Sequence, residues 1–235
     1  MPDERVSKTP AALSTRADLD AFLARARSLA PPHEAGGHGR LLFALDATMS
    51  RQPTWDTACQ LQAEMFREAS LLGGLEVQLL YYRGFNECRA SPWVSNAQRL
   101  ADLMNRIDCR GGQTQIRKVL AHARRETAKR KVQALVFIGD AMEEPLDDLA
   151  AAAGELGLLG VPAFMFHEGS DAVAERAFRE IARLTRGAYC RFDVGAADTL
   201  RELLRAAAVY AAGGRKALAD ASRGAGARLL LEQLG

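Results

Sequence analysis

Short apolar runs alternate with longer amphipathic segments along most of this chain, and that alternation limits the folds it can adopt. The runs are near-continuously apolar and only a few residues long, which is typical of strands covered on both faces. Most are separated by ten or more residues with helical spacing of apolar positions, which favours β-α-β crossovers and parallel pairing. We therefore predict an α/β fold: a doubly wound, mostly parallel six-stranded sheet with helices on both faces.

The predicted elements divide the chain into three parts. The strands are 41–45, 76–82, 87–93 (a short edge strand), 133–138, 163–166 and 188–192, and the helices are 52–72, 96–107, 114–129, 146–159, 172–185 and 196–211. A further helix is predicted at 15–30. Residues 1–39 then form an N-terminal helix and Gly-rich linker, residues 40–212 the α/β domain, and residues 213–235 a C-terminal tail that is either a short helix or frayed.

Composition and charge exclude several classes of partner. The chain of 235 residues is 48% hydrophobic and 26% charged, with a net charge of +2. That balance does not indicate nucleic acid or membrane lipid as a partner, and no apolar run approaches the length of a membrane span. Without an apolar signal-peptide core near the start, we expect a cytoplasmic protein. The four cysteines form no C-x-x-C pair, so we expect reduced thiols, although Cys88 and Cys109 both fall near predicted loops that could approach each other.

A group of oxygen-bearing side chains follows the first predicted strand. The apolar run 41–45 ends at Asp46, and Thr48 and Ser50 follow at alternate positions. If this loop curls, a carboxylate and two hydroxyls converge on one point. Such a set of hard oxygen ligands suits Mg²⁺, Mn²⁺ or Ca²⁺ better than Zn²⁺ or Cu²⁺.

Two further oxygen donors belong to the same predicted edge of the sheet. Asp140 follows the strand at 133–138, and Thr114 follows the glycine pair Gly111-Gly112. In a doubly wound sheet the first and fourth strands flank the point where the strand order reverses, and ligands bind at the carboxyl ends there. We therefore predict a metal site formed by Asp46, Thr48, Ser50, Thr114 and Asp140.

This pattern resembles the metal-ion-dependent adhesion site (MIDAS) of von Willebrand factor A-type (VWA) domains. That family has Asp-x-Ser-x-Ser after its first strand, a Thr after a Gly-rich loop, and an Asp after its fourth strand. Asp46, Ser50, Thr114 and Asp140 match, while Thr48 replaces the first Ser and Gly139-Asp140-Ala141 replaces the commoner Thr-Asp-Gly. The resemblance covers roughly residues 40–212.

The resemblance implies a non-enzymatic binding module. In VWA domains the metal keeps one coordination position open for an acidic side chain of a partner protein. The expected cofactor is Mg²⁺, or Mn²⁺ or Ca²⁺, and the expected partner is a protein with an exposed Asp or Glu. Two alternatives remain: a VWA scaffold that has lost its metal, and a Mg²⁺-dependent phosphatase of the haloacid-dehalogenase type. The phosphatase would need an acid where Thr48 stands.

Five patterns have simpler structural explanations. A nearby helix could be capped by Asp46, Thr48 or Thr114. The acidic group after Asp140 is expected to interact with the positive N-terminal end of the helix at 146–159 rather than to surround the metal; it comprises Glu143, Glu144, Asp147 and Asp148. The basic segment 117–131 reads as a solvated helix face. His167-Glu168 reads as a rim pair without chemistry. Tyr81, Tyr82, Phe85 and Trp93 read as core and edge packing.

Overall fold

The computed structural model describes residues 38–70, 74–193 and 196–221. In this part of the chain six strands form one sheet in the order β3-β2-β1-β4-β5-β6. All neighbouring strands are parallel except β2 and β3. The predicted doubly wound α/β fold with an edge strand at 87–93 is confirmed. The expected helix at 15–30 and most of the linker and tail lie outside the described residues.

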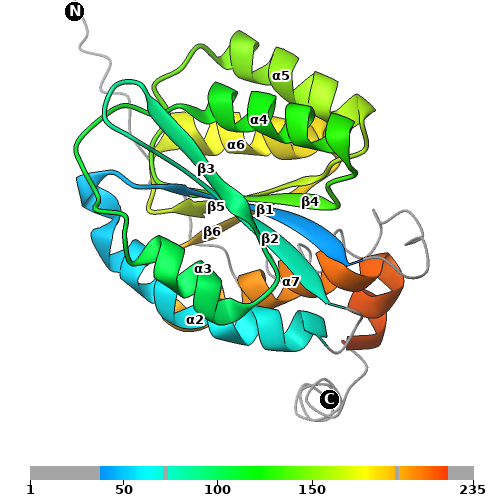
Figure 1. Cartoon of the computed structure of the whole chain (residues 1–235). Coiled ribbons are helices and arrows are strands. Elements are labelled where there is room, and N and C mark those ends of the chain that lie inside the picture. The colour runs from blue at the N-terminus through cyan, green and yellow to red at the C-terminus, as the bar shows by residue number, and fades with distance from the viewer. Residues whose placement is uncertain (1–37, 71–73, 194–195, 222–235) are drawn as a thin grey trace, which may run out of the picture.

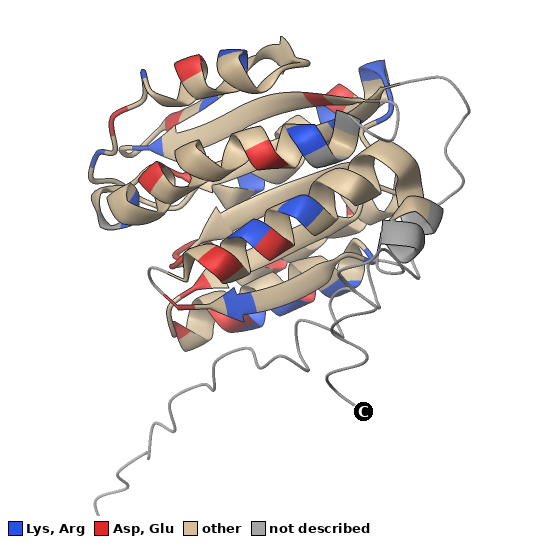
Figure 2. Ribbon diagram, turned by 90° about the horizontal axis from the view of Figure 1, so that it is seen from below, with Lys and Arg blue, Asp and Glu red and all other residues tan. Residues whose placement is uncertain are grey.

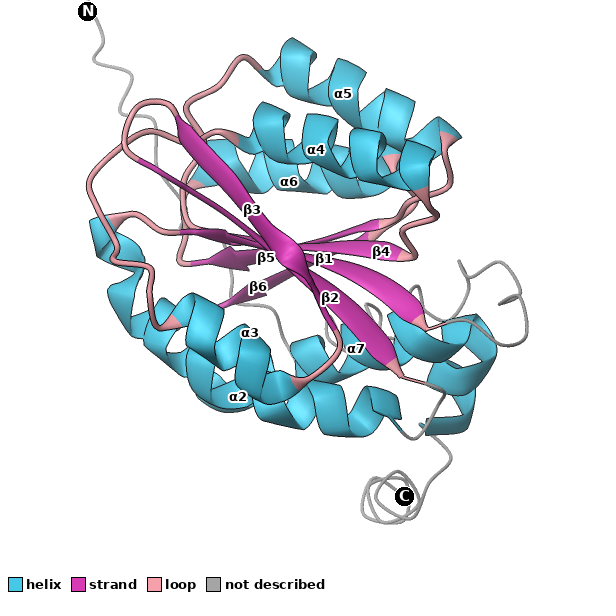
Figure 3. Cartoon of the chain, in the orientation of Figure 1, coloured by secondary structure: helices cyan, strands magenta, loops and turns pink. Residues whose placement is uncertain are grey.

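The strands are β1 (Gly39–Asp46), β2 (Leu75–Arg83), β3 (Glu87–Val94), β4 (Ala134–Gly139), β5 (Ala163–Glu168) and β6 (Ala188–Phe192), and the helices are η1 (Met49–Arg51), α2 (Gln52–Ser70), α3 (Ala97–Met104), α4 (Ile116–Lys129), α5 (Leu146–Leu158), α6 (Ala172–Leu184) and α7 (Ala197–Ala221). Helices cover both faces of the sheet (Figure 1). In Figure 3, α4, α5 and α6 lie on one side of the strands, and α2, α3 and α7 lie on the other.

The central strands β1, β4 and β5 contribute to two hydrophobic cores, which explains their near-continuous apolar runs. In β1, Leu41, Phe43 and Leu45 pack into the core beneath α2, α3 and α7. Leu42 and Ala44 point to the opposite core beneath α4, α5 and α6. This alternation is the two-residue period of a strand, here with both faces buried.

Gly213-Gly214 is predicted to end the last helix, and the helical conformation does break at Gly214, where φ is 67° and ψ is −163°. Beyond this kink a helix continues to Ala221, so the first residues of the tail, predicted to be either a short helix or frayed, are helical. Glycine adopts this backbone conformation at little cost, so the chain bends there and resumes as a helix. Among the described residues, no helix is long and apolar enough to cross a membrane.

The four cysteines are free thiols, as expected. The suggested approach of Cys88 to Cys109 is wrong, because the two side chains pack on opposite sides of the sheet. Cys109 belongs to the core beneath α2, α3 and α7, whereas Cys88 packs against the core beneath α4, α5 and α6.

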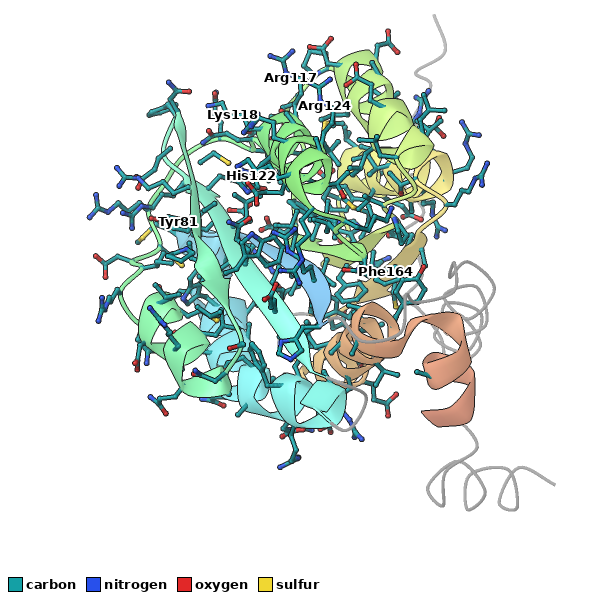
Figure 4. All side chains as sticks on the ribbon, turned by 45° about the vertical axis from the view of Figure 1, so that its right-hand side comes forward. Tyr81, Arg117, Lys118, His122, Arg124 and Phe164 are labelled. Carbon is teal, nitrogen blue, oxygen red and sulfur yellow. The ribbon has the colours of Figure 1, made fainter. Side chains whose placement is uncertain are left out.

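Charged residues of both signs are interspersed on the helices seen in Figure 2. Figure 4 shows Arg117, Lys118, His122 and Arg124 along α4, the helix of the basic segment. Several of its cations have acidic partners: Arg117 lies 3.9 Å from Asp148, and Arg124 pairs with Glu155. The segment is therefore a helix face with partly neutralised charge.

Candidate functional site

The sheet topology brings the predicted oxygen donors to one edge. β1 and β4 are neighbours at the point where the strand order reverses, and Leu45 is paired with Ile138. Asp46 is the last residue of β1, and Asp140 follows the last residue of β4. Their positions follow directly from the lengths of two parallel strands in register.

A crevice of about 250 Å³ lies at this edge. Its walls are Asp46, Thr48, Met49, Gly111, Gly112, Thr114, Asp140, Ala141 and Glu143. Four of the five residues predicted from the sequence line it, and they come from three separate segments of the chain. The fifth, Ser50, has its backbone in η1, and its side chain lies outside the described part of the structure.

Asp46 is held in place by groups from its own loop and from β2. The backbone N–H of Thr48 donates to Oδ1 of Asp46 at 2.8 Å, and the hydroxyl of Tyr82 donates to Oδ2 at 3.2 Å. Tyr82 is fully buried and lies opposite Asp46 in the β1–β2 register. The carboxylate is therefore fixed in orientation. The helix-capping explanation for Thr48 fails, since its side chain makes no cap hydrogen bond to η1.

The electrostatics of the crevice disfavour a second negative charge. Burial raises the pKa of the Asp46 carboxyl to about 6, and the nearby Asp140 carboxylate raises it too, while hydrogen bonds from Thr48 and the charge of Arg51 lower it. Like charges in a partly desolvated site repel each other. A cation in the crevice would relieve that repulsion.

Thr114 is not a helix cap, which corrects the simpler explanation for it. α4 begins at Ile116, after Gln115. The hydroxyl of Thr114 accepts from the backbone N–H of Glu143 at 3.0 Å, and the backbone N–H of Thr114 donates to Oε2 of Glu143 at 3.2 Å. This pair of hydrogen bonds ties the glycine loop to the loop after β4. A hydroxyl oxygen with one acceptor position used keeps a second one for another ligand.

The expectation that Glu143 and Glu144 interact with the N-terminal end of the helix at 146–159 is wrong. Glu143 lines the crevice, where it is exposed to solvent. Glu144 accepts hydrogen bonds from the backbone N–H groups of Ile116 and Arg117, so it caps α4, a helix that precedes it in the chain. Asp147 and Asp148 do lie in the first turn of α5. Glu144 can cap α4 because the fold places the loop after β4 next to the start of that helix.

His167 and Glu168 are wholly buried, so the prediction of a rim pair is wrong. Nδ1 of His167 lies 2.9 Å from the hydroxyl of Tyr189, and burial lowers the pKa of the imidazole. Glu168 forms a buried ion pair with Arg51 and accepts a hydrogen bond from the hydroxyl of Thr54. Arg51 directly follows Ser50, so this ion pair anchors the turn after the Asp-x-Thr-x-Ser motif to the end of β5.

The departure of this chain from Thr-Asp-Gly at Asp140 has a packing reason on its N-terminal side. A Cβ atom at Gly139 would lie 2.7 Å from the ring of Phe137, closer than real contacts allow. The ring of Phe137 is itself held between Tyr82 and Phe178, with centroid distances of 6.2 and 5.3 Å. A threonine at position 139 would therefore disturb the aromatic packing beneath the crevice.

The donors in the crevice are compatible with a hard divalent cation. Two carboxylates and two hydroxyls provide oxygen ligands of the kind that Mg²⁺ and Ca²⁺ prefer. Among the described residues, no cluster of three or more His, Cys, Asp or Glu side chains is placed to hold a metal ion. Any cation in this crevice therefore depends on the hydroxyl groups of Thr48 and Thr114, together with backbone groups or water.

Comparison with known proteins identifies the fold. No protein-family model matches the chain, and no curated protein matches it either. Among solved structures, it is similar to a von Willebrand factor type A protein from Catenulispora acidiphila (19% identity, TM-score 0.58, covering 73% of this chain and 43% of that one). It is also similar to the SpRpn10 VWA domain (12% identity, TM-score 0.55, covering 76% and 98%).

A third similar structure is proximal thread matrix protein 1 of the mussel byssus with a zinc-occupied MIDAS motif (16% identity, TM-score 0.57, covering 74% of this chain and 46% of that one). This chain thus spans less than half the length of the first and third of these proteins. At such low identity the similarity establishes the fold alone. The chain has the α/β fold of VWA domains.

Proposed function

We propose that this chain is a metal-dependent protein-binding module. In this proposal Asp46, Thr48, Ser50, Thr114 and Asp140 hold a divalent cation, Mg²⁺ or alternatively Mn²⁺ or Ca²⁺. The cation in turn binds an exposed Asp or Glu of a partner protein. The observation that carries the proposal is that Asp46, Thr48, Thr114 and Asp140, from three separate segments, line one crevice.

The charges of the crevice support an incoming acid. The two inner carboxylates, Asp46 and Asp140, balance a divalent cation, and a carboxylate from outside would complete its shell. The third carboxylate, Glu143, is exposed and hydrogen-bonded to Thr114, so water screens it. VWA-fold neighbours support a role as an interaction module in general, and one is described with a metal in its MIDAS motif.

The phosphatase alternative finds less support. Its general acid would stand at position 48, where this chain has a threonine. Among the described residues lining the crevice there is no lysine or arginine to hold a phosphate. The described part of the crevice also has no histidine that could act as a base. The remaining alternative is a VWA scaffold that has lost its metal. Absence of metal binding by wild type in the titration described next would favour this alternative.

The test is a calorimetric titration of Mn²⁺ into chelator-treated protein. Wild type is expected to bind one ion, and Asp140→Ala is expected to lose that binding. Asp148→Ala is the matched control, because it removes an exposed acid from the first turn of α5 that does not line the crevice. Equal binding by wild type and Asp140→Ala would contradict the proposed site. Turnover of an aryl phosphate that depends on Asp46 would favour the phosphatase instead.

A further inference from the structure

Two large apolar side chains are exposed beside the crevice. Met49, which lines it, is 67% exposed, and Phe85, at the tip of the β2–β3 hairpin, is 80% exposed. The other aromatic residues of this region are packed, as predicted: Tyr81 lies against Trp55, with a centroid distance of 6.3 Å, and Trp93 lies under the guanidinium of Arg40 at 3.7 Å. Phe85 is the exception to that prediction.

The hairpin that carries Phe85 is fixed against the glycine loop of the crevice. The backbone N–H of Gln113 donates to the carbonyl of Gly84 at 3.0 Å, and the side-chain amide of Gln115 lies 3.3 Å from the same carbonyl. In Figure 1 the β2–β3 hairpin tip lies on the same side of the molecule as the start of α2, where β1 ends. Phe85 is therefore held next to the crevice by two contacts with the carbonyl of Gly84, its neighbour in the turn.

The two glycines between Phe85 and the crevice differ in what they require. A Cβ atom at Gly112 would lie 2.3 Å from backbone atoms of Gly84, so the contact with the hairpin explains this glycine. A Cβ atom at Gly111 would meet nothing within 4 Å, and its φ lies outside the left-handed region. Gly111 is exposed, so no described contact within the chain accounts for it. Glycine also occurs where another backbone must approach closely, and that explanation fits Gly111.

We propose that Met49, Gly111 and Phe85 form a docking surface for an extended segment of the partner, in which a large apolar side chain stands near the captured acid. This inference rests on the proposed metal site. The acid would enter the crevice, the segment's backbone would cross the bare surface at Gly111, and the apolar side chain would pack on Phe85 or Met49. Exposed apolar side chains that become buried at an interface supply affinity, while the charged contact supplies register.

The experiment selects displayed random peptides with one fixed central Asp on the chelator-treated protein with added Mg²⁺. Selected peptides are expected to carry an aromatic or large aliphatic residue at a constant spacing from the Asp. Their binding is expected to fall about tenfold or more with Phe85→Ser, a loss typical of an apolar anchor. Gly111→Leu should weaken the same peptides by blocking the approach of their backbone.

Matched measurements separate the possible outcomes. Leu158→Ser removes a 91% exposed apolar residue at the end of α5 and should leave peptide binding unchanged. Mn²⁺ titration and urea unfolding should be the same for Phe85→Ser and wild type. Mg²⁺-dependent, Asp-dependent peptides without apolar enrichment would overturn the docking surface and leave the proposed function standing. Peptides that bind equally well in chelator, or without their Asp, would overturn the proposed function itself and the docking surface with it.

Discussion

Two pairs of charged residues, Arg51 with Glu168 and Asp46 with the half-buried Asp140, lie near the carboxyl edge of the sheet and are arranged in opposite ways. Arg51 and Glu168 have opposite charges, are both almost wholly buried and form an ion pair. Asp46 and Asp140 have like charges, and burial, together with the charge of Asp140, raises the pKa of Asp46. The ion pair brings together opposite charges of the chain, whereas the two aspartates bring together like charges that a bound cation would balance. We infer that the Arg51–Glu168 pair stabilises the loop, whereas Asp46 and Asp140 are suited to binding a ligand.

The largest expected effect comes from breaking the ion pair. Glu168→Ala leaves the buried Arg51 guanidinium without its carboxylate, which should lower the free energy of unfolding by about 3–5 kcal/mol in urea titrations. The control is Glu155→Ala, whose partner Arg124 is about half exposed; that change should cost less than about 1 kcal/mol. Similar losses from both variants would show that Arg51 and Glu168 do not support the structure more than a surface pair does.

The next effect concerns the pH dependence of the metal-free protein. The folded pKa of Asp46 is raised to about 6 from its usual 3.8, so the ionised carboxylate destabilises the fold above pH 6. That penalty disappears as the pH falls from 7 through 6 towards 4, and at neutral pH it amounts to at most about 3 kcal/mol. In chelator, Asp46→Asn should therefore be more stable than wild type at pH 7.5 and should lose this advantage at pH 4.5.

Urea unfolding at a series of pH values checks this prediction. The difference between the two proteins isolates Asp46 from the other carboxylates, whose pKa values move in both directions. A difference that does not vary with pH would mean that neither burial nor the charge of Asp140 raises the pKa of Asp46 in the folded protein.

A smaller effect is expected from the rim of the crevice. Glu143→Gln keeps an oxygen that can accept the hydrogen bond from Thr114 but removes one negative charge. Affinity for free Mn²⁺ should fall about threefold to tenfold, equivalent to about 1 kcal/mol. Capture of Asp-containing peptides at saturating metal should become tighter, because the crevice is then less negative. Tighter metal binding by Glu143→Gln would show that the negative charge of Glu143 does not contribute to metal affinity.

The smallest effect tests the hydroxyl of Thr48. Thr48→Ser keeps the oxygen and should bind Mn²⁺ almost as wild type does. Thr48→Val keeps the shape and loses the oxygen, so its metal affinity should fall while its unfolding temperature in chelator stays close to that of wild type. Equal metal affinity of the serine and valine variants would remove Thr48 from the set of ligands.

The fold and the placement of the crevice were predictable because both depend on local patterns and strand order. Asp46 and Asp140 each follow an apolar run, and the doubly wound order makes those runs neighbours. The Arg51–Glu168 ion pair was missed because no spacing along the chain relates a residue after β1 to the last residue of β5. The cap of α4 by Glu144 was missed for the same reason.

The exposure of Phe85 also escaped prediction. Tyr81, Tyr82 and Trp93 belong to the strands predicted at 76–82 and 87–93 and pack as expected, whereas Phe85 falls between those strands, a position that could have indicated its exposure. What separates it is its place in the hairpin turn, beyond the last pair of β2 and β3, Arg83 with Glu87. Past that pair, the described part of the chain leaves the ring of Phe85 80% exposed.

The proposed site requires a divalent cation in the crevice to offset the burial and the like charge that raise the pKa of Asp46. The most direct test measures how much Mn²⁺ raises the free energy of unfolding of wild type and Asp46→Asn at pH 7.5 and pH 5. Binding to the folded state alone stabilises it in proportion to the logarithm of ligand concentration. We predict a clear stabilisation of wild type at pH 7.5, a smaller one at pH 5 where a proton on Asp46 competes with the ion, and almost none for Asp46→Asn at either pH. Equal stabilisation of both proteins, or no dependence on pH in wild type, would contradict the account.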